Sequence, residues 1–418
     1  MSMDNGKILI LSNSIIGLYS FRKELVAALV DRGYHVWISS PDDDSPKYAY
    51  FKGLGCEMVK TPLDRRGTNP LRDWGLLRFY RKLMREMKPS AVLTYTIKPN
   101  VYGGIAARWE HVPQLANITG LGTAIENPGL LRGTAVALYR FGLKQAKTVF
   151  YQNVSIQKFC QENRIGRSGV LLPGSGVNLE WHAMQPYPQQ GSPVRFLFIG
   201  RMMRDKGTDE FLEMAAAVKL AHPQVEFHIL GPCEDDYEAR VAEAHSRGTV
   251  VWHGSVSDVR PFMREAWCTV LPSYHEGMAN VLLESAGAGR PVITSDIPGC
   301  REAVDDGVTG LLCSVRDASA LTAAVERFLK LPYDEKVRMG IAGREKMRKE
   351  FDREIVVRAY LDVLAGLPHR DHVVGLPHRD HVVGLPHRDH VVGLPHCDHV
   401  VGLPHCDSPT GTTSQNED

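Results

Sequence analysis

The sequence predicts an α/β protein of two doubly wound parallel sheets, each a Rossmann-like domain, that face each other across a cleft and are followed by a repetitive tail. Short apolar runs alternate with helix-like stretches in both halves of the chain, which is the pattern of repeated β-α-β units. The alternation is interrupted once, by a Pro-, Gln- and Gly-rich stretch at residues 185–193 that we interpret as a linker. The 418 residues also suit two domains better than one.

The first half of the chain, residues 1–184, is expected to form the first domain. Its predicted strands are apolar runs suited to burial on both faces of a sheet: Lys7–Leu11, His35–Ser39, Ala91–Thr96 and Thr148–Tyr151. Its predicted helices have apolar residues at helical spacing: Ser20–Val30, Tyr102–Trp109 and Thr134–Gln145. The polar residues Ser12–Gly17 are predicted to form the loop between the first strand and the first helix.

The second half repeats the pattern over residues 194–345. Its predicted strands are Arg195–Ile199, Val225–Leu230, Thr249–Trp252, Cys268–Leu271, Pro291–Thr294 and Gly310–Cys313. Helices are expected at Asp209–Ala221, at about Ala279–Ala288 and within 320–364, where residues 346–365 form a C-terminal helix that packs back on the first domain. Doubly wound sheets bind ligands at the carboxyl ends of their strands, so the loops after the strands are expected to carry the function.

The tail differs from the rest of the chain in charge and in pattern. The net charge of +1 is the sum of −4 over residues 366–418 and +5 over residues 1–365. The nonapeptide Gly-Leu-Pro-His-Arg-Asp-His-Val-Val begins at Gly366 and recurs every nine residues. Each copy contains a proline and can bury little surface, so we expect a disordered tail. Metal binding by its nine histidines is the alternative.

The cysteines and the apolar runs indicate a cytosolic protein. None of the eight cysteines forms a C-x-x-C pair, and no secretory signal is recognisable at the start. No apolar run approaches the roughly 18 residues that span a bilayer. The stretch Asp64–Lys88 has eight basic and three acidic residues interleaved with Trp74 and Leu77. It predicts peripheral contact with an anionic membrane surface or a lipid diphosphate, with an ordinary domain helix as the alternative. The near-neutral total makes nucleic-acid binding unexpected.

Two carboxylates mark the segment from Leu271 to Asp296. Glu276 falls in the loop at a predicted helix start, and Glu284 lies about two turns into that helix, so the pair could serve two ends of one elongated ligand. The backbone amides at the helix start favour an anion; these are the amides of Gly277, Met278, Ala279 and Asn280. The alternative is a solvated glutamate on an amphipathic helix.

A second segment places cations after a strand. Gly200, Arg201, Lys206 and Gly207 follow the buried run at 195–199, and two cations there suit a diphosphate. The alternative is a pair of ordinary surface cations at a turn. The acidic run Asp42–Asp44 lies in a loop with Ser and Pro neighbours, and we interpret it as a solvated turn, with no metal site.

Together these segments resemble the retaining glycosyltransferases of family 4, which have the GT-B fold. The resemblance spans roughly residues 6–364 and is most specific in the second half. The matching strings are Gly200-Arg201…Lys206-Gly207, Glu276…Glu284, Gly-Arg-Pro-Val-Ile at 289–293, Asp296…Glu302, Gly307…Gly310 and Gly174-Ser-Gly-Val-Asn178. Within the family, the chain is most similar to bacterial enzymes that extend lipid-linked O-antigen, capsule or glycoprotein glycans.

The resemblance implies a substrate and a role for each residue. The second domain would bind a nucleotide sugar, expected to be UDP-linked, with no separate cofactor. Arg201 and Lys206 would contact its diphosphate, Glu284 the ribose, and Glu276 a hydroxyl of the transferred sugar. Gly17 would let the backbone approach the reacting centre. The first domain would bind an undecaprenyl-diphosphate-linked saccharide at the inner face of the plasma membrane. A UDP-N-acetylglucosamine 2-epimerase, which shares the fold, is the alternative.

One segment departs from the family pattern. Many members carry a histidine in the loop after the fourth strand, whereas this chain has Asn117-Ile-Thr-Gly-Leu-Gly122. The base for the acceptor is therefore unassigned. The leaving phosphate could take the proton, with Thr119 and Gly120 shaping the site.

Overall fold

The computed structural model describes residues 5–41, 46–63, 69–121, 130–234 and 236–367, which all belong to one compact unit. The predictions for Asp42–Asp44 and for the repeats from residue 368 onward lie outside the described residues, as do Arg65 and Arg66 of the basic stretch.

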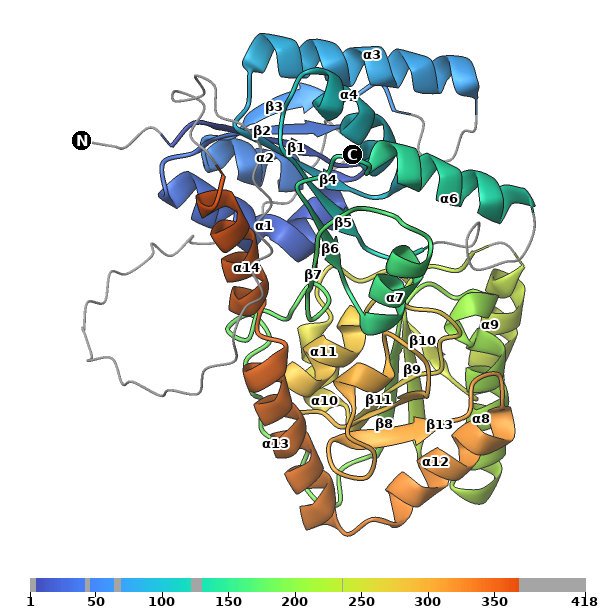
Figure 1. Ribbon diagram of the computed structural model, residues 1–418. Helices are drawn as coiled ribbons and strands as arrows, with labels where there is room; N and C mark the ends of the chain where they lie inside the picture. Colours follow the sequence, from blue (N-terminus) through green and yellow to red (C-terminus); the bar gives the residue numbers. More distant parts are fainter. Residues whose placement is uncertain (1–4, 42–45, 64–68, 122–129, 235, 368–418) are drawn as a thin grey trace, which may run out of the picture. The chain divides into compact units, whose positions relative to one another are not determined.

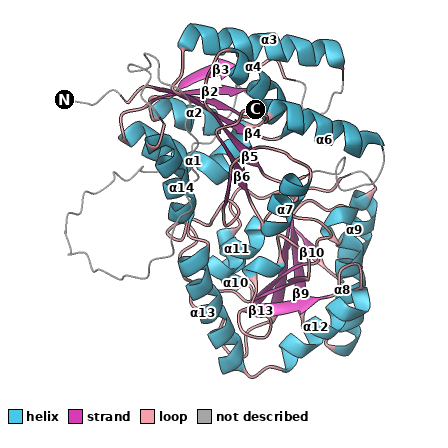
Figure 2. Ribbon diagram, viewed as in Figure 1, coloured by secondary structure: helices cyan, strands magenta, loops and turns pink. Residues whose placement is uncertain are grey.

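The first domain is built on a seven-stranded parallel sheet in the order β3-β2-β1-β4-β5-β6-β7 (Figures 1 and 2). The strands are β1 (Lys7–Leu11), β2 (His35–Ser40), β3 (Glu57–Lys60), β4 (Ala91–Tyr95), β5 (Gln114–Ile118), β6 (Thr148–Tyr151) and β7 (Gly169–Leu171). The helices are α1 (Ile15–Asp31), α2 (Pro46–Gly53), α3 (Pro70–Met87), the π-helix η1 (Pro99–Gly103), α4 (Gly104–Trp109), α6 (Leu130–Gly142) and α7 (Val154–Glu162).

The second domain is built on a six-stranded parallel sheet in the order β10-β9-β8-β11-β12-β13. The strands are β8 (Arg195–Ile199), β9 (Glu226–Leu230), β10 (Val251–Trp252), β11 (Cys268–Leu271), β12 (Val292–Ser295) and β13 (Gly310–Cys313). The helices are η2 (Arg204–Lys206), α8 (Thr208–Ala221), α9 (Tyr237–Ser246), α10 (Arg260–Glu265), α11 (Asn280–Gly287), η3 (Arg301–Ala303), α12 (Ala318–Lys330), α13 (Tyr333–Glu350) and α14 (Arg353–Ala365).

Each sheet is covered by helices on both faces, as an all-parallel sheet requires. In β1, Leu9 and Leu11 enter the core beside α3 and α4, whereas Ile8 and Ile10 enter the core beside α1 and α14. Alternate residues of a strand point to opposite faces, so this one apolar run supplies both cores. The last helix, α14, packs against α1 of the first domain, and Tyr360 is fully buried there.

The predicted fold class is confirmed, and the sequence predicts most accurately the strands that are continuous apolar runs. The predicted bounds of β1, β6, β8, β11 and β13 match the structure, whereas β3, β5 and β7 were missed. In β5, Gln114 and Asn117 are buried but polar, so the segment has no continuous apolar run. The residues Asn117 and Ile118, predicted to lie in a loop, are the end of this strand.

The prediction that Gly17 lies in the loop after the first strand is wrong. Helix α1 begins at Ile15, and Gly17 lies in its first turn. The Ser14 side chain caps the helix by accepting a hydrogen bond from the Gly17 amide at 3.3 Å. The loop after β1 is therefore shortened to Ser12–Ser14.

Both sheets reverse their strand order at one point. This switch point lies between β1 and β4 in the first sheet and between β8 and β11 in the second. In doubly wound sheets the crevice for ligands opens at the carboxyl ends of these strands. The loops after β1, β4, β8 and β11 are thus the places where a site is expected.

Candidate active site

A cavity of about 450 Å³ lies between residues of the two domains. We call its two sides the N-terminal wall and the C-terminal wall. The N-terminal wall includes Ser12 after β1, Gly17 and Arg22 of α1, Tyr95 at the end of β4, Thr96 after it, and Thr119 after β5. The C-terminal wall consists of Glu276, Gly277, Met278 and Asn280, which follow β11. Five predicted site residues therefore line one cavity: Gly17, Glu276, Gly277, Met278 and Asn280.

Glu276 is held by a cation from the neighbouring loop. Lys206 forms an ion pair with its Oε1 atom, and the Ser273 hydroxyl donates to the same oxygen at 2.9 Å. The side chains of Lys206 and Glu276 are 23% and 12% exposed. Glu276 lines the cavity, and Lys206, which does not line it, fixes the position of the Glu276 carboxylate.

The loops after β8 and β11 are brought together by backbone contacts. Gly207 has φ of +69°, and a Cβ atom there would come within 2.1 Å of the Pro272 carbonyl oxygen. The amide of Tyr274 donates to the Asp205 carbonyl at 2.8 Å. The glycine of the Lys206-Gly207 string thus permits the close approach that brings Lys206 to Glu276.

The start of α11 contributes unpaired polar groups to the C-terminal wall. Its N-cap residue, Ala279, has no side chain that could cap the helix. The Asn280 Oδ1 atom is buried and has no hydrogen-bond partner. Across the cavity rim, a Cβ atom on Gly277 would come within 2.0 Å of the Thr119 carbonyl oxygen. The Ala279 amide, predicted to face an anion, donates to the Gly299 carbonyl at 2.8 Å. No side chain caps the helix, and it is this uncapped start, not the acceptor oxygen of Asn280, that suits an anionic ligand.

Arg201 and Glu284 do not join this cluster. Arg201 is half exposed and forms an ion pair with Glu234, and it does not line the cavity. Glu284 is half-buried on the second turn of α11 and is also absent from the cavity lining. Burial raises the pKa of Glu284 to about 7, and the positive charge of Arg353 opposes that rise. Of the four predicted charged residues, Lys206 and Glu276 alone are in contact.

The N-terminal wall contains residues that the sequence analysis missed. Arg22 of α1 is 3% exposed, and Tyr95 at the end of β4 is 5% exposed. The Arg22 Nε and the Thr96 hydroxyl are buried without a hydrogen-bond partner, whereas the Tyr95 hydroxyl interacts with Arg22 and Tyr360. A signal existed for Arg22, because it is a cation on the helix face that buries Leu18 and Leu25. No histidine is found among the described residues that line the cavity.

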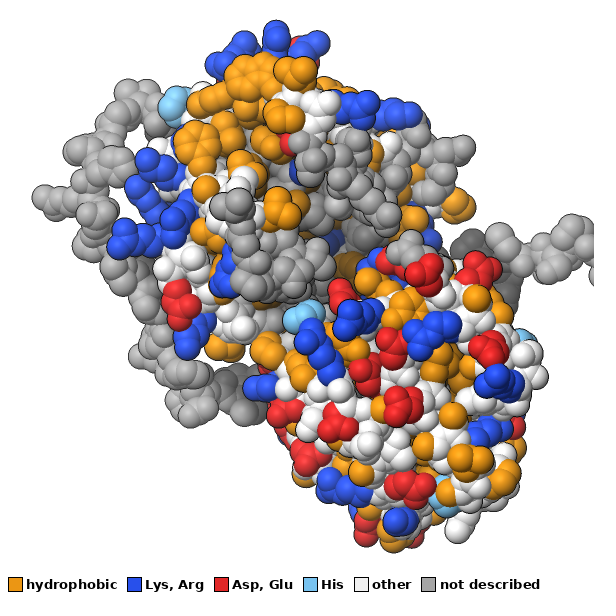
Figure 3. Space-filling model, turned by 90° about the vertical axis from the view of Figure 1, so that its right-hand side faces the viewer, with side chains coloured by type: hydrophobic (Ala, Val, Ile, Leu, Met, Phe, Trp, Pro, Cys, Tyr) orange, Lys and Arg blue, Asp and Glu red, His pale blue; other side chains and the backbone are white. Residues whose placement is uncertain are grey.

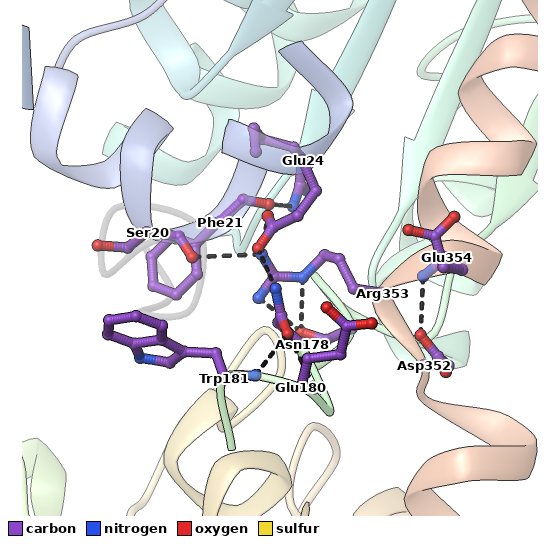
Figure 4. A network of polar contacts seen from close by, with 11 residues as sticks. Ser20, Phe21, Glu24, Asn178, Glu180, Trp181, Asp352, Arg353 and Glu354 are labelled. Carbon is purple, nitrogen blue, oxygen red and sulfur yellow. Dashed lines mark hydrogen bonds and ion pairs between the residues drawn. The ribbon is translucent and has the colours of Figure 1, made fainter. Parts of the chain in front are cut away.

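Arg353, at the start of α14, belongs to a network of polar contacts with the first domain (Figure 4). Its guanidinium donates to the Gly176 carbonyl at 3.0 and 3.1 Å and to the Glu24 carboxylate of α1 at 2.8 Å. Glu24 also accepts from the Asn178 amide at 2.8 Å. The chain passes from the first domain to the second near Val177 and returns near Phe351. These two crossings lie side by side, because the Val177 amide donates to the Phe351 carbonyl at 2.8 Å.

Arg290 and Glu302 belong to two of the motifs that resemble family 4, and both make hydrogen bonds that stabilise the second domain. Arg290 is fully buried and donates to backbone carbonyls, including those of Met263 at 2.9 Å and Pro186 at 2.7 Å. It therefore ties the segment after residue 184 to the second domain. Glu302 accepts a hydrogen bond from the Gly299 amide at 2.7 Å and so fixes the loop that packs on Glu276.

The basic stretch forms α3, and most of its apolar residues are core residues. Leu77, Leu83, Met84 and Met87 are buried in the first domain, as the alternative interpretation expected of an ordinary helix. Arg81 and Arg85 share the carboxylate of Glu110. Leu71 and Trp74 remain 81% and 54% exposed at the N-terminal end of α3. Among the described residues, no helix is both long and apolar enough to cross a membrane.

Two family models cover most of this fold. Residues 7–153 match a model described as "Glycosyl transferase 4-like", and residues 193–331 match one described as "Glycosyl transferases group 1".

Curated relatives agree with these matches. A protein of Campylobacter jejuni, N,N'-diacetylbacillosaminyl-diphospho-undecaprenol alpha-1,3-N-acetylgalactosaminyltransferase, is 25% identical over 370 residues, which cover 84% of this chain and 96% of the relative. A glycogen synthase of Mycobacterium tuberculosis is 32% identical over 203 residues, which cover 47% of this chain and 49% of the relative.

Solved structures share the fold at low sequence identity. The structure of HepE from Anabaena in complex with UDP and glucose has a TM-score of 0.70 and 16% identity, with 87% of this chain and 100% of that chain covered. A sucrose-phosphate synthase from Thermosynechococcus elongatus has a TM-score of 0.68 and 19% identity, with coverage of 86% and 99%. Taken with the two-sheet architecture, these matches show that the chain is a glycosyltransferase and belongs to the GT-B glycosyltransferases with a 4-like first domain and a group 1 second domain.

Proposed function

We propose that this glycosyltransferase is a retaining hexosyltransferase that moves a sugar from a UDP-linked donor to a saccharide on undecaprenyl diphosphate. The observation that carries the proposal is the Lys206–Glu276 ion pair beside the uncapped start of α11, facing the first domain across one cavity. The name of the Campylobacter relative supports the lipid-diphosphate acceptor, and the UDP and glucose of the HepE structure support the class of donor.

The charges on the C-terminal wall suit the departure of a diphosphate. When the bond between the sugar C1 and the phosphate oxygen breaks, negative charge grows on the UDP. Lys206 and the amides at the start of α11 stabilise that charge, and they are in place before the reaction begins. Glu276 favours the sugar, which becomes positively charged as the bond breaks. Arg201 would reach the diphosphate after exchanging Glu234 for the phosphate, because its side chain is half exposed.

The acceptor hydroxyl must lose a proton as its oxygen bonds to C1. No histidine, and no carboxylate other than Glu276, is found among the described residues that line the cavity. We therefore assign the proton to an oxygen of the departing phosphate, on the same face of the sugar as the incoming hydroxyl. Attack from that face retains the configuration at C1, and the products are UDP and the extended lipid-linked saccharide.

This function is tested by offering UDP-hexoses, UDP-N-acetylhexosamines and GDP-mannose together with undecaprenyl-diphosphate saccharides. We expect transfer from a UDP-α-sugar, with an α linkage in the product by NMR. A β linkage contradicts retention, and transfer from GDP-mannose alone contradicts the donor class. Incubation with UDP-N-acetylglucosamine and no acceptor tests the epimerase, whose activity would appear as the manno isomer.

We also propose that the N-terminal end of α3 contacts the membrane that holds the acceptor. Leu71 and Trp74 are exposed there. On the face shown in Figure 3, acidic side chains gather on the second domain, whereas hydrophobic and basic side chains dominate the first. Exposed apolar groups with few acids nearby favour an anionic lipid surface.

A pair of matched leucines tests the membrane contact. Leu71 is 81% exposed on the first domain, and Leu220 is 88% exposed on the second. We expect Leu71→Ser to reduce sedimentation with phosphatidylglycerol vesicles severalfold and Leu220→Ser to leave it unchanged. Equal losses in the two variants would contradict a contact through α3.

A further inference from the structure

The N-terminal wall of the cavity holds a buried positive charge without an acidic partner. Arg22 is 3% exposed, and its Nη1 atom donates to the Phe21 carbonyl at 2.6 Å. Its Nε atom has no partner, and no acid in the described part of the chain forms an ion pair with it. The acid next along α1, Glu24, is occupied by Arg353 and Asn178 (Figure 4). A buried charge is costly unless an opposite charge or hydrogen bonds offset it.

The surroundings of Arg22 complete a set of phosphate-binding groups. The Tyr95 and Tyr360 rings lie 5.5 and 5.9 Å from the guanidinium, and they restrict its orientation. The Thr96 hydroxyl is buried without a partner, and the Tyr95 hydroxyl interacts with Arg22 itself; both residues belong to the same wall. Thr96 has φ of +71°, a strained conformation for a β-branched residue that is typical of functional sites. A fixed guanidinium beside an unpartnered hydroxyl suits a phosphate.

We propose that Arg22, Tyr95 and Thr96 bind the diphosphate of the acceptor. The proposal rests on the function proposed above, in which the C-terminal wall takes the diphosphate of the donor. On the C-terminal side, Lys206 and Glu276 are already paired with each other. Arg22 belongs to the opposite wall, where its Nε atom has no hydrogen-bond partner and an anion could bind. This places the acceptor diphosphate in the same cavity as the reacting hydroxyl. The acceptor class is therefore a lipid diphosphate that carries a single sugar.

The test compares a charged and a neutral acceptor analogue at saturating UDP. The charged probe is N-acetylglucosamine linked to farnesyl diphosphate, and the neutral probe is octyl N-acetylglucosaminide. In Arg22→Gln, calorimetry is expected to show the affinity for the charged probe falling about 30- to 100-fold, the usual loss for a buried charged hydrogen-bond pair. Affinity for the neutral probe and for UDP itself stays unchanged. The control Arg32→Gln removes an exposed charge from the far end of α1 and changes neither.

The donor diphosphate is the other source of the same chemistry, and the UDP titration separates the two. If Arg22→Gln weakens UDP binding and leaves the preference for the charged probe intact, the subsite belongs to the donor and the proposal is overturned. Unchanged binding of every probe overturns it as well. Because the readout is binding, a wild-type enzyme that transfers no sugar would refute the proposed function without deciding the assignment of Arg22.

A second variant separates ligand binding from support of the fold. Thr96→Val keeps the β-branch and removes a hydroxyl that has no partner in the protein. We expect an unchanged melting temperature, an unchanged kcat and a severalfold higher KM for the diphosphate-linked acceptor. A lower melting temperature with an unchanged acceptor KM would assign this hydroxyl to the fold and overturn its place in the subsite.

Discussion

The two walls of the cavity differ in how the protein itself satisfies their charges. On the C-terminal wall, Lys206 and Glu276 pair with each other, and Ser273 completes the contact. On the N-terminal wall, the buried Arg22 forms no ion pair with an acid of the described part of the chain, and its Nε atom has no hydrogen-bond partner. Both walls stand at the switch points of similar sheets, so the difference lies in the side chains and not in the architecture.

This contrast suggests a division of work between the domains. A wall whose charges are preorganised can stabilise a transition state without rearrangement. A wall whose buried charge lacks an opposite charge gains free energy when a complementary ligand arrives. We therefore expect changes on the C-terminal wall to lower kcat, and changes on the N-terminal wall to raise the KM for the acceptor.

The largest effect is expected for Lys206→Ala. Without the cation, the departing diphosphate loses its fixed partner, and kcat should fall about 10³-fold, the cost typical of removing one such group. Steady-state kinetics with a lipid-linked acceptor measure this. The matched control is Lys158→Ala, whose side chain is 75% exposed on α7. Activity within tenfold of the wild type would break the comparison, because the C-terminal wall would then not provide the catalysis.

A large loss of stability is expected for Arg353→Met. The substitution leaves Glu24 and the Gly176 carbonyl without their main partner in a buried setting, at a cost of about 3 kcal/mol in the free energy of unfolding. Urea denaturation measures it, with Arg358→Met, an exposed change on the same helix, as control. A variant as stable as the wild type would show that the junction does not depend on this contact.

Gly17→Ala separates activity from stability. A Cβ atom at Gly17 would lie 3.7 Å or more from its neighbours, so the protein has room for it. Alanine in a helix favours folding by up to about 1 kcal/mol. We expect a protein at least as stable as the wild type, with transfer reduced about 30-fold because the methyl group obstructs the approach of the substrates. Full activity would show that no substrate comes close to the backbone here.

The smallest effect concerns the pH dependence of donor binding. Burial raises the pKa of Glu284 to about 7, so the carboxyl is protonated in the folded protein at pH 6 and ionised at pH 8. Ribose hydroxyls would donate to the ionised form, and the KM for the UDP-sugar should fall about tenfold between these values. Glu284→Gln should remove the dependence. The same raised pKa favours folding below about pH 4.5 and loses that contribution as the pH rises through 7.

The sequence predicts the C-terminal wall better than the N-terminal wall. Lys206, Glu276 and the start of α11 belong to short strings that follow apolar strands, so both the fold and the C-terminal wall could be located in advance. The N-terminal wall could not, because Arg22 and Tyr95 look like ordinary helix and strand residues until the sheet brings them together. Gly17 was assigned to a loop because the capping hydrogen bond from its amide to Ser14 has no hydrophobic signature. The role of Arg201 stays a prediction, since its motif is specific but its side chain pairs with Glu234 in this structure.

The paired crossings at Val177 and Phe351 have a consequence for how such enzymes exchange parts. The chain leaves the first domain near residue 177 and returns near residue 352, so α14 belongs by packing to a domain from which most of the second half separates it. If two parent genes recombined at a single point between the domains, α14 of one parent would have to pack on the first-domain sheet of the other. Tyr360 would then have to fit a foreign Asn117 and Phe150. A graft that brings in a new donor specificity intact therefore needs two joints, placed at these neighbouring crossings.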